Sequence, residues 1–68
     1  MRVIVNGEER DLAPGTTLAE LVRSLPGAPD GRGLAVAVDG EVVARGSWSA
    51  KQLTEGARVE IVVAVQGG

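Results

Sequence analysis

The 68-residue chain contains no cysteine, histidine, tyrosine or phenylalanine, and Trp48 is its one aromatic residue. Without cysteine the chain forms no disulfide, zinc knuckle, iron–sulfur cluster or thiol nucleophile. Without histidine it lacks the commonest general base and metal ligand at neutral pH. Ser24, Ser47 and Ser49 therefore have no conventional base partner. We expect the protein not to be an enzyme and to bind no metal.

Charge and long apolar runs are also scarce. Seven Lys and Arg residues against nine Asp and Glu residues give a formal net charge of −2. Such a chain lacks the basic surface and the aromatic platform by which proteins bind nucleic acids. No segment reaches the ~18 apolar residues of a membrane span, and the first residues do not have the pattern of a signal peptide. We expect a cytoplasmic protein, monomeric when free, with neither a nucleic acid nor a membrane as partner.

Two hairpins are predicted from the dipeptides Asn6-Gly7 and Asp39-Gly40, because both central residues of a type I′ turn need positive φ. Segments rich in β-branched residues flank both turns, and the most apolar segment follows near the end of the chain. The five strands are expected at residues 2–6, 9–12, 34–38, 41–44 and 58–65.

One amphipathic helix is predicted to begin at Thr17, which has capping-box spacing to Glu20. The apolar residues that follow recur at i, i+3, i+4 and i+7 and share one face of the helix. They are Leu18, Leu21, Val22 and Leu25. Pro26 is expected to end the helix. Because two turns of helix are unstable alone in water, this apolar face must pack on the sheet.

The order of the elements is strand, strand, helix, strand, strand, strand. A single helical turn, capped by Ser47, is expected within residues 46–52. This order is typical of an α+β fold of the ubiquitin-like β-grasp type, in which a mixed five-stranded sheet packs on one amphipathic helix. We expect the first and last strands to lie side by side in the middle of the sheet. The β-grasp domain is predicted at residues 1–65, and a flexible tail at residues 66–68.

The last predicted strand alternates between two faces. Four residues are expected to face the core: Val59, Ile61, Val63 and Val65. Val62 and Ala64 belong to the opposite face, near Ile4 if the first and last strands pair. These three residues predict a small exposed apolar patch.

Gln66, Gly67 and Gly68 follow this strand. At the average glycine usage of about 7%, two glycines at given positions occur by chance in roughly 0.5% of sequences, and at the glycine content of this chain in about 2%, so the pair alone is a weak signal. A chain end without Cβ atoms can enter a narrow channel, where the groups of another protein approach its backbone closely. A carboxylate there is a poor electrophile until adenylation supplies a leaving group. The pair therefore suggests a carboxylate that a partner activates.

Several segments together resemble one known family across the whole chain. They are Val5-Asn6-Gly7-Glu8, the run 17–22, the run 35–43, Arg45-x-x-Trp48, Leu53-x-Glu55-Gly56 and the final run 59–68. In these segments the chain resembles the sulfur carriers of thiamine biosynthesis, the ThiS family. The glycine pair is shared with molybdopterin-synthase small subunits and with ubiquitin. The Arg45-x-x-Trp48 motif and the short chain favour the thiamine branch.

The resemblance implies three partners. A ubiquitin-activating-like adenylyltransferase would use ATP and magnesium to convert the Gly68 carboxylate to an acyl-adenylate. A persulfide from a sulfurtransferase would displace AMP and leave a thiocarboxylate on Gly68, and thiazole synthase would accept the sulfur. Gln66 and Gly67 would enter the partner's channel, and the chain itself would hold no cofactor. The partner docking face is expected around Ile4, Val62 and Ala64.

Three alternatives remain open from the sequence. The first is sulfur donation to molybdopterin, 2-thiouridine or cysteine synthesis. The second is a ubiquitin-like modifier conjugated to lysines, although the single Lys51 would give chains on itself one linkage site. The third is a β-grasp interaction module whose tail carries no chemistry.

Overall fold

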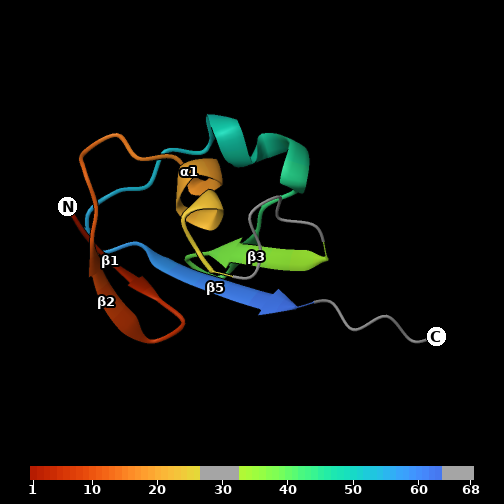
Figure 1. Cartoon of the computed structure of the whole chain (residues 1–68), viewed down its shortest axis with the longest axis horizontal. Helices are drawn as coiled ribbons and strands as arrows, with labels where there is room; N and C mark the ends of the chain where they lie inside the picture. The colour runs from red at the N-terminus through yellow and green to blue at the C-terminus, as the bar shows by residue number, and fades with distance from the viewer. Residues whose placement is uncertain (27–32, 64–68) are drawn as a thin grey trace.

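The computed structural model of the chain describes residues 1–26 and 33–63. The elements, in chain order, are β1 (Arg2–Val5), β2 (Glu8–Asp11), α1 (Leu18–Arg23), β3 (Leu34–Val38), β4 (Glu41–Val42), the 3-10 helix η1 (Arg45–Ala50) and β5 (Arg58–Val63). The strands form one sheet in the order β2-β1-β5-β3-β4. Only the β1–β5 pair is parallel among these neighbours, so the sheet is mixed. Figure 1 shows α1 and η1 on the same side of the sheet. The predicted α+β, ubiquitin-like β-grasp fold is therefore confirmed.

Strand β5 is the centre of this sheet, with β1 beside it as predicted. It pairs with β3 over residues 59–63, from Val38↔Val59 to Leu34↔Val63. Its pairing with β1 is much shorter and ends at Val5↔Val59. Residues 60–63 of β5 therefore have a neighbouring strand on one side only.

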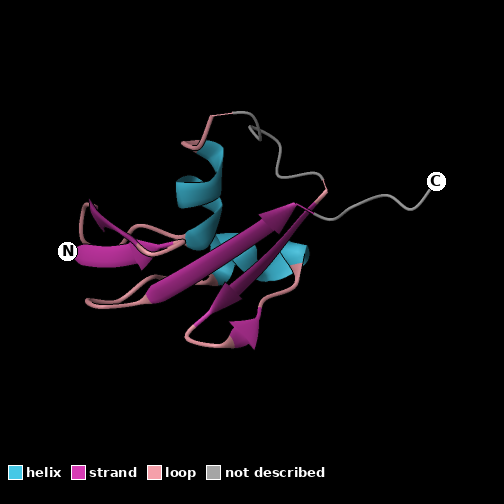
Figure 2. Ribbon diagram, turned by 90° about the horizontal axis from the view of Figure 1, so that it is seen from below, coloured by secondary structure: helices cyan, strands magenta, loops and turns pink. Residues whose placement is uncertain are grey.

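The hydrophobic core fills the space between the sheet and α1. We call the side of the sheet that α1 and η1 cover the inner face, and the opposite side the outer face (Figures 1 and 2). The buried core residues come from the inner face, from α1 and from the segment around η1. They are Val3, Val5, Leu18, Leu21, Val22, Val36, Val38, Trp48, Leu53, Ala57 and Val59. Trp48 belongs to this core, where its indole Nε1 donates to the Val43 carbonyl oxygen at 2.8 Å.

Helix α1 begins with the predicted capping box. The Glu20 N–H donates to Thr17 Oγ1 at 3.2 Å, and the Thr17 N–H donates to Glu20 Oε1 at 2.8 Å. The helix ends at Arg23, earlier than the Leu25–Pro26 step predicts, because Ser24 forms the C-cap. Leu25 lies outside the helix and is half-buried. The apolar face of α1 thus consists of Leu18, Leu21 and Val22.

The two type I′ turns have the predicted backbone. Asn6 and Gly7 have φ of 49° and 83°, and Asp39 and Gly40 have φ of 51° and 84°. The strands beside them differ slightly from the prediction: β2 begins one residue earlier, and β4 ends at Val42. Neither helix in the described part of the chain is long and apolar enough to cross a membrane.

Two local predictions are wrong. Ser47 does not cap η1: the helix begins at Arg45, its N-cap is Ala44, and Ser47 lies inside it. Val63 is not in the core, since its relative exposure is 69%. It lies at the end of β5 opposite Leu34, whereas the buried part of the inner face ends with the half-buried Ile61. Val65 and the predicted tail, residues 66–68, lie outside the described residues.

Candidate functional site

The predicted site residues fall into two groups. Ile4 and Val62 are described, on β1 and β5. The others lie beyond Val63, outside the described residues, and keep their status as predictions. They are Ala64, Gln66, Gly67 and Gly68. The structure therefore describes the strand that precedes the tail, β5, and the surface around that strand.

Ile4 and Val62 share the outer face but do not lie together. Ile4 is opposite Arg58 in the β1–β5 pair, and Val62 is four residues further along β5. At ~3.3 Å per residue this separates them by about 13 Å along the strand. The half-buried Ile4 lines one surface depression and the exposed Val62 lines another, with Glu60 at both.

Val62 lies in an apolar patch whose other members the sequence did not predict. Val62 is paired with Ala35, and Ala37 is paired with Val42. These four side chains line one depression, and we call them the outer-face patch. Val42 and Val62 have relative exposures of 77% and 61%. The alanines are too short to cover them, so both β-branched side chains remain open to solvent, Val62 near the end of β5 and Val42 on β4. Glu60, which is paired with Ala37, lines the same depression.

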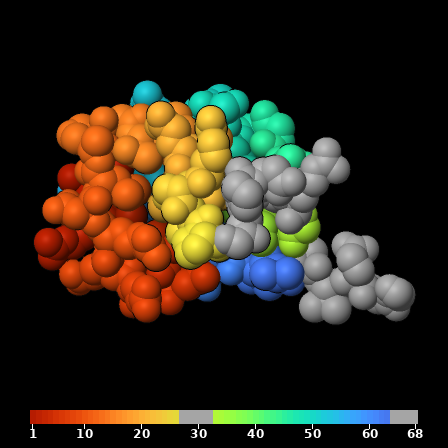
Figure 3. Space-filling model, in the orientation of Figure 1, coloured from red at the N-terminus to blue at the C-terminus, as the bar shows by residue number. Residues whose placement is uncertain are grey.

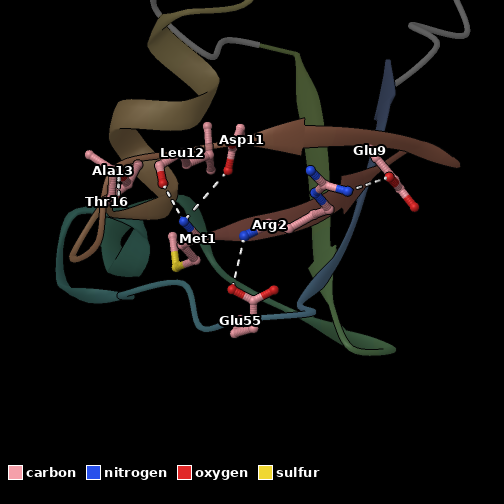
Figure 4. Close-up of polar contacts among 8 residues, drawn as sticks. All are labelled: Met1, Arg2, Glu9, Asp11, Leu12, Ala13, Thr16 and Glu55. Carbon is pink, nitrogen blue, oxygen red and sulfur yellow. Dashed lines mark hydrogen bonds and ion pairs between the residues drawn. The ribbon is translucent and has the colours of Figure 1, made fainter.

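The β1–β2 edge of the outer face carries an ion pair. Arg2 Nη1 donates to Glu9 Oε1 at 3.2 Å, and both side chains are exposed (Figure 4). In the same region the Arg2 main-chain N–H donates to Glu55 Oε1 at 3.0 Å. An exposed ion pair of this kind contributes little to stability. The outer face thus has an ion pair at its β1–β2 edge and the outer-face patch over β3, β4 and the end of β5, with the charged Arg58 and Glu60 of β5 between them.

The two turn residues with positive φ also hold β5. The Asp39 N–H donates to the Arg58 carbonyl oxygen at 2.7 Å, and the Arg58 N–H donates to Asp39 Oδ1 at 2.9 Å. Asn6 Nδ2 donates to the Ile61 carbonyl oxygen at 3.2 Å, and the Ile61 N–H donates to Asn6 Oδ1 at 2.8 Å. Sequence reasoning assigned both residues to turns alone. The only signal for the second role is that Asn and Asp, rather than Gly, occupy these positions.

The described residues offer little for catalysis within the chain. In residues 1–26 and 33–63 no three acidic side chains lie close enough together to hold a metal ion. No described polar side-chain atom is buried without a hydrogen-bond partner. What the described surface provides is an apolar patch and a strand whose chain continues into the glycine tail.

Comparison with known proteins identifies the family. Residues 3–68 match the model of the ThiS family. This chain belongs to the ThiS family. The resemblance seen in the sequence motifs is thereby confirmed, and the ThiS-family match extends over the whole run from β1 to Gly68.

Solved structures and one sequence relative agree with this assignment. The crystal structure of the thiamine biosynthesis protein ThiS from Geobacter metallireducens has a TM-score of 0.85 and 28% identity to this chain, with 100% of each chain covered. An NMR structure of a thiamine biosynthesis protein from the same organism has a TM-score of 0.76 and 30% identity, and covers 100% of this chain and 88% of that one. A thiazole synthase from Paramagnetospirillum magneticum (strain AMB-1) is 32% identical over 68 residues. The match takes in 100% of this ThiS-family chain and 20% of that protein, so the chain spans a fifth of its relative's length.

Proposed function

We propose that this protein is a sulfur carrier of thiamine biosynthesis, which receives sulfur as a thiocarboxylate on Gly68 and donates it to thiazole synthase. The observation that carries the proposal is the ThiS-family match over residues 3–68. A fold shared over the full length with a thiamine biosynthesis protein supports it. In this role the chain is a substrate of other enzymes and not itself an enzyme.

The charging reaction takes place on a partner. A carboxylate oxygen of Gly68 attacks the α-phosphorus of ATP, pyrophosphate leaves, and an acyl-adenylate forms. The terminal sulfur of a sulfurtransferase persulfide then attacks the acyl carbon, and AMP leaves. A second thiol of the partner enzymes cleaves the resulting acyl disulfide, forming a protein disulfide and the Gly68 thiocarboxylate. ATP and magnesium belong to the adenylyltransferase, and the carrier is proposed to act in the cytoplasm, where ATP is supplied.

Thiazole synthase is the proposed acceptor. The support is that a protein named thiazole synthase contains a segment matching this entire chain. A carrier-like segment joined covalently to an acceptor enzyme has a high effective concentration at that enzyme. The same advantage arises for a separate carrier only if it docks there, so we infer docking of this chain on thiazole synthase.

The proposed docking face includes Ile4, Val62 and Ala64, and the outer-face patch around Val62 enlarges it. Apolar residues that remain exposed as a group are typical of protein interaction sites. Val62 lies on β5, one residue before the described chain ends at Val63. A partner that covers this patch is therefore close to the point where the tail begins, and Gln66 and Gly67 are proposed to run from there into its channel.

Reconstitution of the complete reaction tests the proposal. The protein, the adenylyltransferase, a sulfurtransferase with cysteine, ATP and magnesium are combined with thiazole synthase and its other substrates, and the thiazole product is measured. We expect product with the full chain and none with a variant that lacks Gly68. A thiocarboxylated carrier that supplies molybdopterin synthase but not thiazole synthase would move the protein to the molybdopterin pathway. No charging at all by active partner enzymes would leave only an interaction module.

A further inference from the structure

The last side-chain support of β5 on its β1 side comes from one residue, Asn6. The Asn6 N–H donates to the Val59 carbonyl oxygen at 2.9 Å, where the β1–β5 pairing ends. Beyond that point the Asn6 carboxamide forms the hydrogen bonds to β5, to the N–H and the C=O of Ile61. A side chain here replaces one residue of a neighbouring strand.

The direction of the main-chain groups explains why Ile61 is the residue held. In an antiparallel pair, alternate residues point their N–H and C=O groups toward the partner strand. Arg58 bonds Asp39 on the β3 side, so Ile61 and Val63 point their groups toward the β1 side. Asn6 satisfies Ile61. Within the described part of the chain, no partner on this side follows for Val63.

We propose that Asn6 is a positioning residue for the C-terminal end of β5. Its amide fixes Ile61 against β1, so that β5 is held from both sides up to two residues before the described chain ends. This holds in place the end of β5 that precedes the tail. The consequence for sulfur transfer rests on the proposed function: a tail that starts from a fixed strand loses less conformational freedom when it enters the partner's channel.

The chemistry of the side chain fits this role. Ile61 presents one donor and one acceptor, and a carboxamide offers one of each in return. A carboxylate would leave the Ile61 carbonyl facing a second acceptor. At Asp39 a carboxylate suffices, because the Asp39 main-chain N–H already bonds the Arg58 carbonyl. The two turns are otherwise alike in backbone, so they form a matched pair for experiment.

The test compares Asn6→Gly with Asp39→Gly. Both variants place a glycine before a glycine in a type I′ turn, which keeps the turn and adds the same unfolded-chain entropy. Amide hydrogen exchange is measured first, without any partner, relative to the slowest-exchanging amides of the sheet. In Asn6→Gly we expect exchange at Ile61 to rise about tenfold, because the hydrogen bond from the Ile61 N–H to Asn6 Oδ1 is lost. In Asp39→Gly we expect the rise at Arg58 instead, with Ile61 unchanged.

The second measurement is the rate of adenylation as a function of carrier concentration. We expect Asn6→Gly to raise KM about three- to tenfold with kcat unchanged, because the reacting carboxylate is untouched while docking requires more ordering. Asp39→Gly is expected to keep both constants. Asn6→Asp, which keeps the acceptor for the Ile61 N–H and loses the donor, is expected between Asn6→Gly and the unmodified protein.

Two results would overturn the proposal. One is exchange at Ile61 that does not change in Asn6→Gly, which would mean that the carboxamide does not hold β5. The other is an equal rise of KM in both glycine variants, which would mean that Asn6 acts through general stability only. If the unmodified protein is not adenylated at all, the proposed function fails, while the exchange result still tests the positioning of β5.

Discussion

The inner and outer faces of the same sheet have opposite characters. On β5, the inner-face Val59 is completely enclosed by the core, while the outer-face Val62 is largely exposed. The inner face is covered by α1 and η1, and no described element covers the outer face (Figures 1 and 2). The space-filling view shows the end of β5 at the surface next to β3 (Figure 3). Val59 and Val62 lie three residues apart on one strand and thus have different roles. Val59 stabilises the fold, and Val62 is available to a partner.

The inner face should be the most sensitive to a change of polarity. Val59→Thr keeps the shape and β-branching of the side chain but puts a hydroxyl into the core. We expect a loss of about 2 kcal/mol in the free energy of unfolding, since a hydroxyl would enter an apolar core in which no buried side-chain polar atom of the described residues lacks a partner. Urea denaturation measures this. A loss below about 0.5 kcal/mol would mean that the inner face does not carry the stability.

The same substitution on the outer face should act on docking instead. For Val62→Thr we expect unfolding free energy within about 0.5 kcal/mol of the unmodified protein, because the side chain is already exposed. The KM for adenylation should rise about three- to tenfold as a polar group enters an apolar contact. Steady-state kinetics and urea denaturation on the same sample separate the two effects. An unchanged KM would remove Val62 from the docking face.

The cap of α1 tests how far the inner face depends on its helix. Thr17→Ala removes the hydroxyl that accepts from the Glu20 N–H, and we expect a loss of about 1 kcal/mol in the free energy of unfolding. The adenylation kinetics of the folded protein should not change, since Thr17 lies at the start of α1, on the side of the sheet opposite the proposed docking face. Thermal denaturation followed by circular dichroism measures the loss. Full stability in the variant would mean that packing alone holds this short helix.

The smallest effect is expected at the ion pair on the β1–β2 edge of the outer face. Arg2→Gln breaks the exposed ion pair with Glu9. We expect the free energy of unfolding to fall by less than about 0.5 kcal/mol and the KM for adenylation to stay unchanged. A KM that rises with this variant would extend the docking face beyond Ile4 to the ion pair of Arg2 and Glu9. Paired with Val62→Thr, it therefore tells which part of the outer face the partner covers.

Most of the fold could be predicted because its signals are local. Thr17 with Glu20 predicts the capping box, and Asn6-Gly7 predicts a turn from the dihedral angles that the two residues favour. The alternation of Val3 and Val5 predicts the inner face of β1. Each of these depends on residues a few positions apart, so the sequence alone contains the information.

The features that escaped prediction depend on long-range placement. Val63 is exposed because the elements that cover the inner face do not extend to the end of β5. The outer-face patch forms because Val62 is paired with Ala35. The bonds from Asn6 to Ile61 join residues 55 positions apart. All three features depend on how far two strands pair with each other. The order of the strands in the chain does not specify the length of that pairing.

The central claim is that sulfur is carried on Gly68, and intact-mass spectrometry of the charged protein tests it most directly. After incubation with ATP, magnesium, adenylyltransferase, sulfurtransferase and cysteine, the account predicts a mass increase equal to the exchange of one oxygen for one sulfur. Fragmentation should place that increase on Gly68. An unchanged mass with partner enzymes that charge another carrier, or an added sulfur on any other residue, would contradict the account.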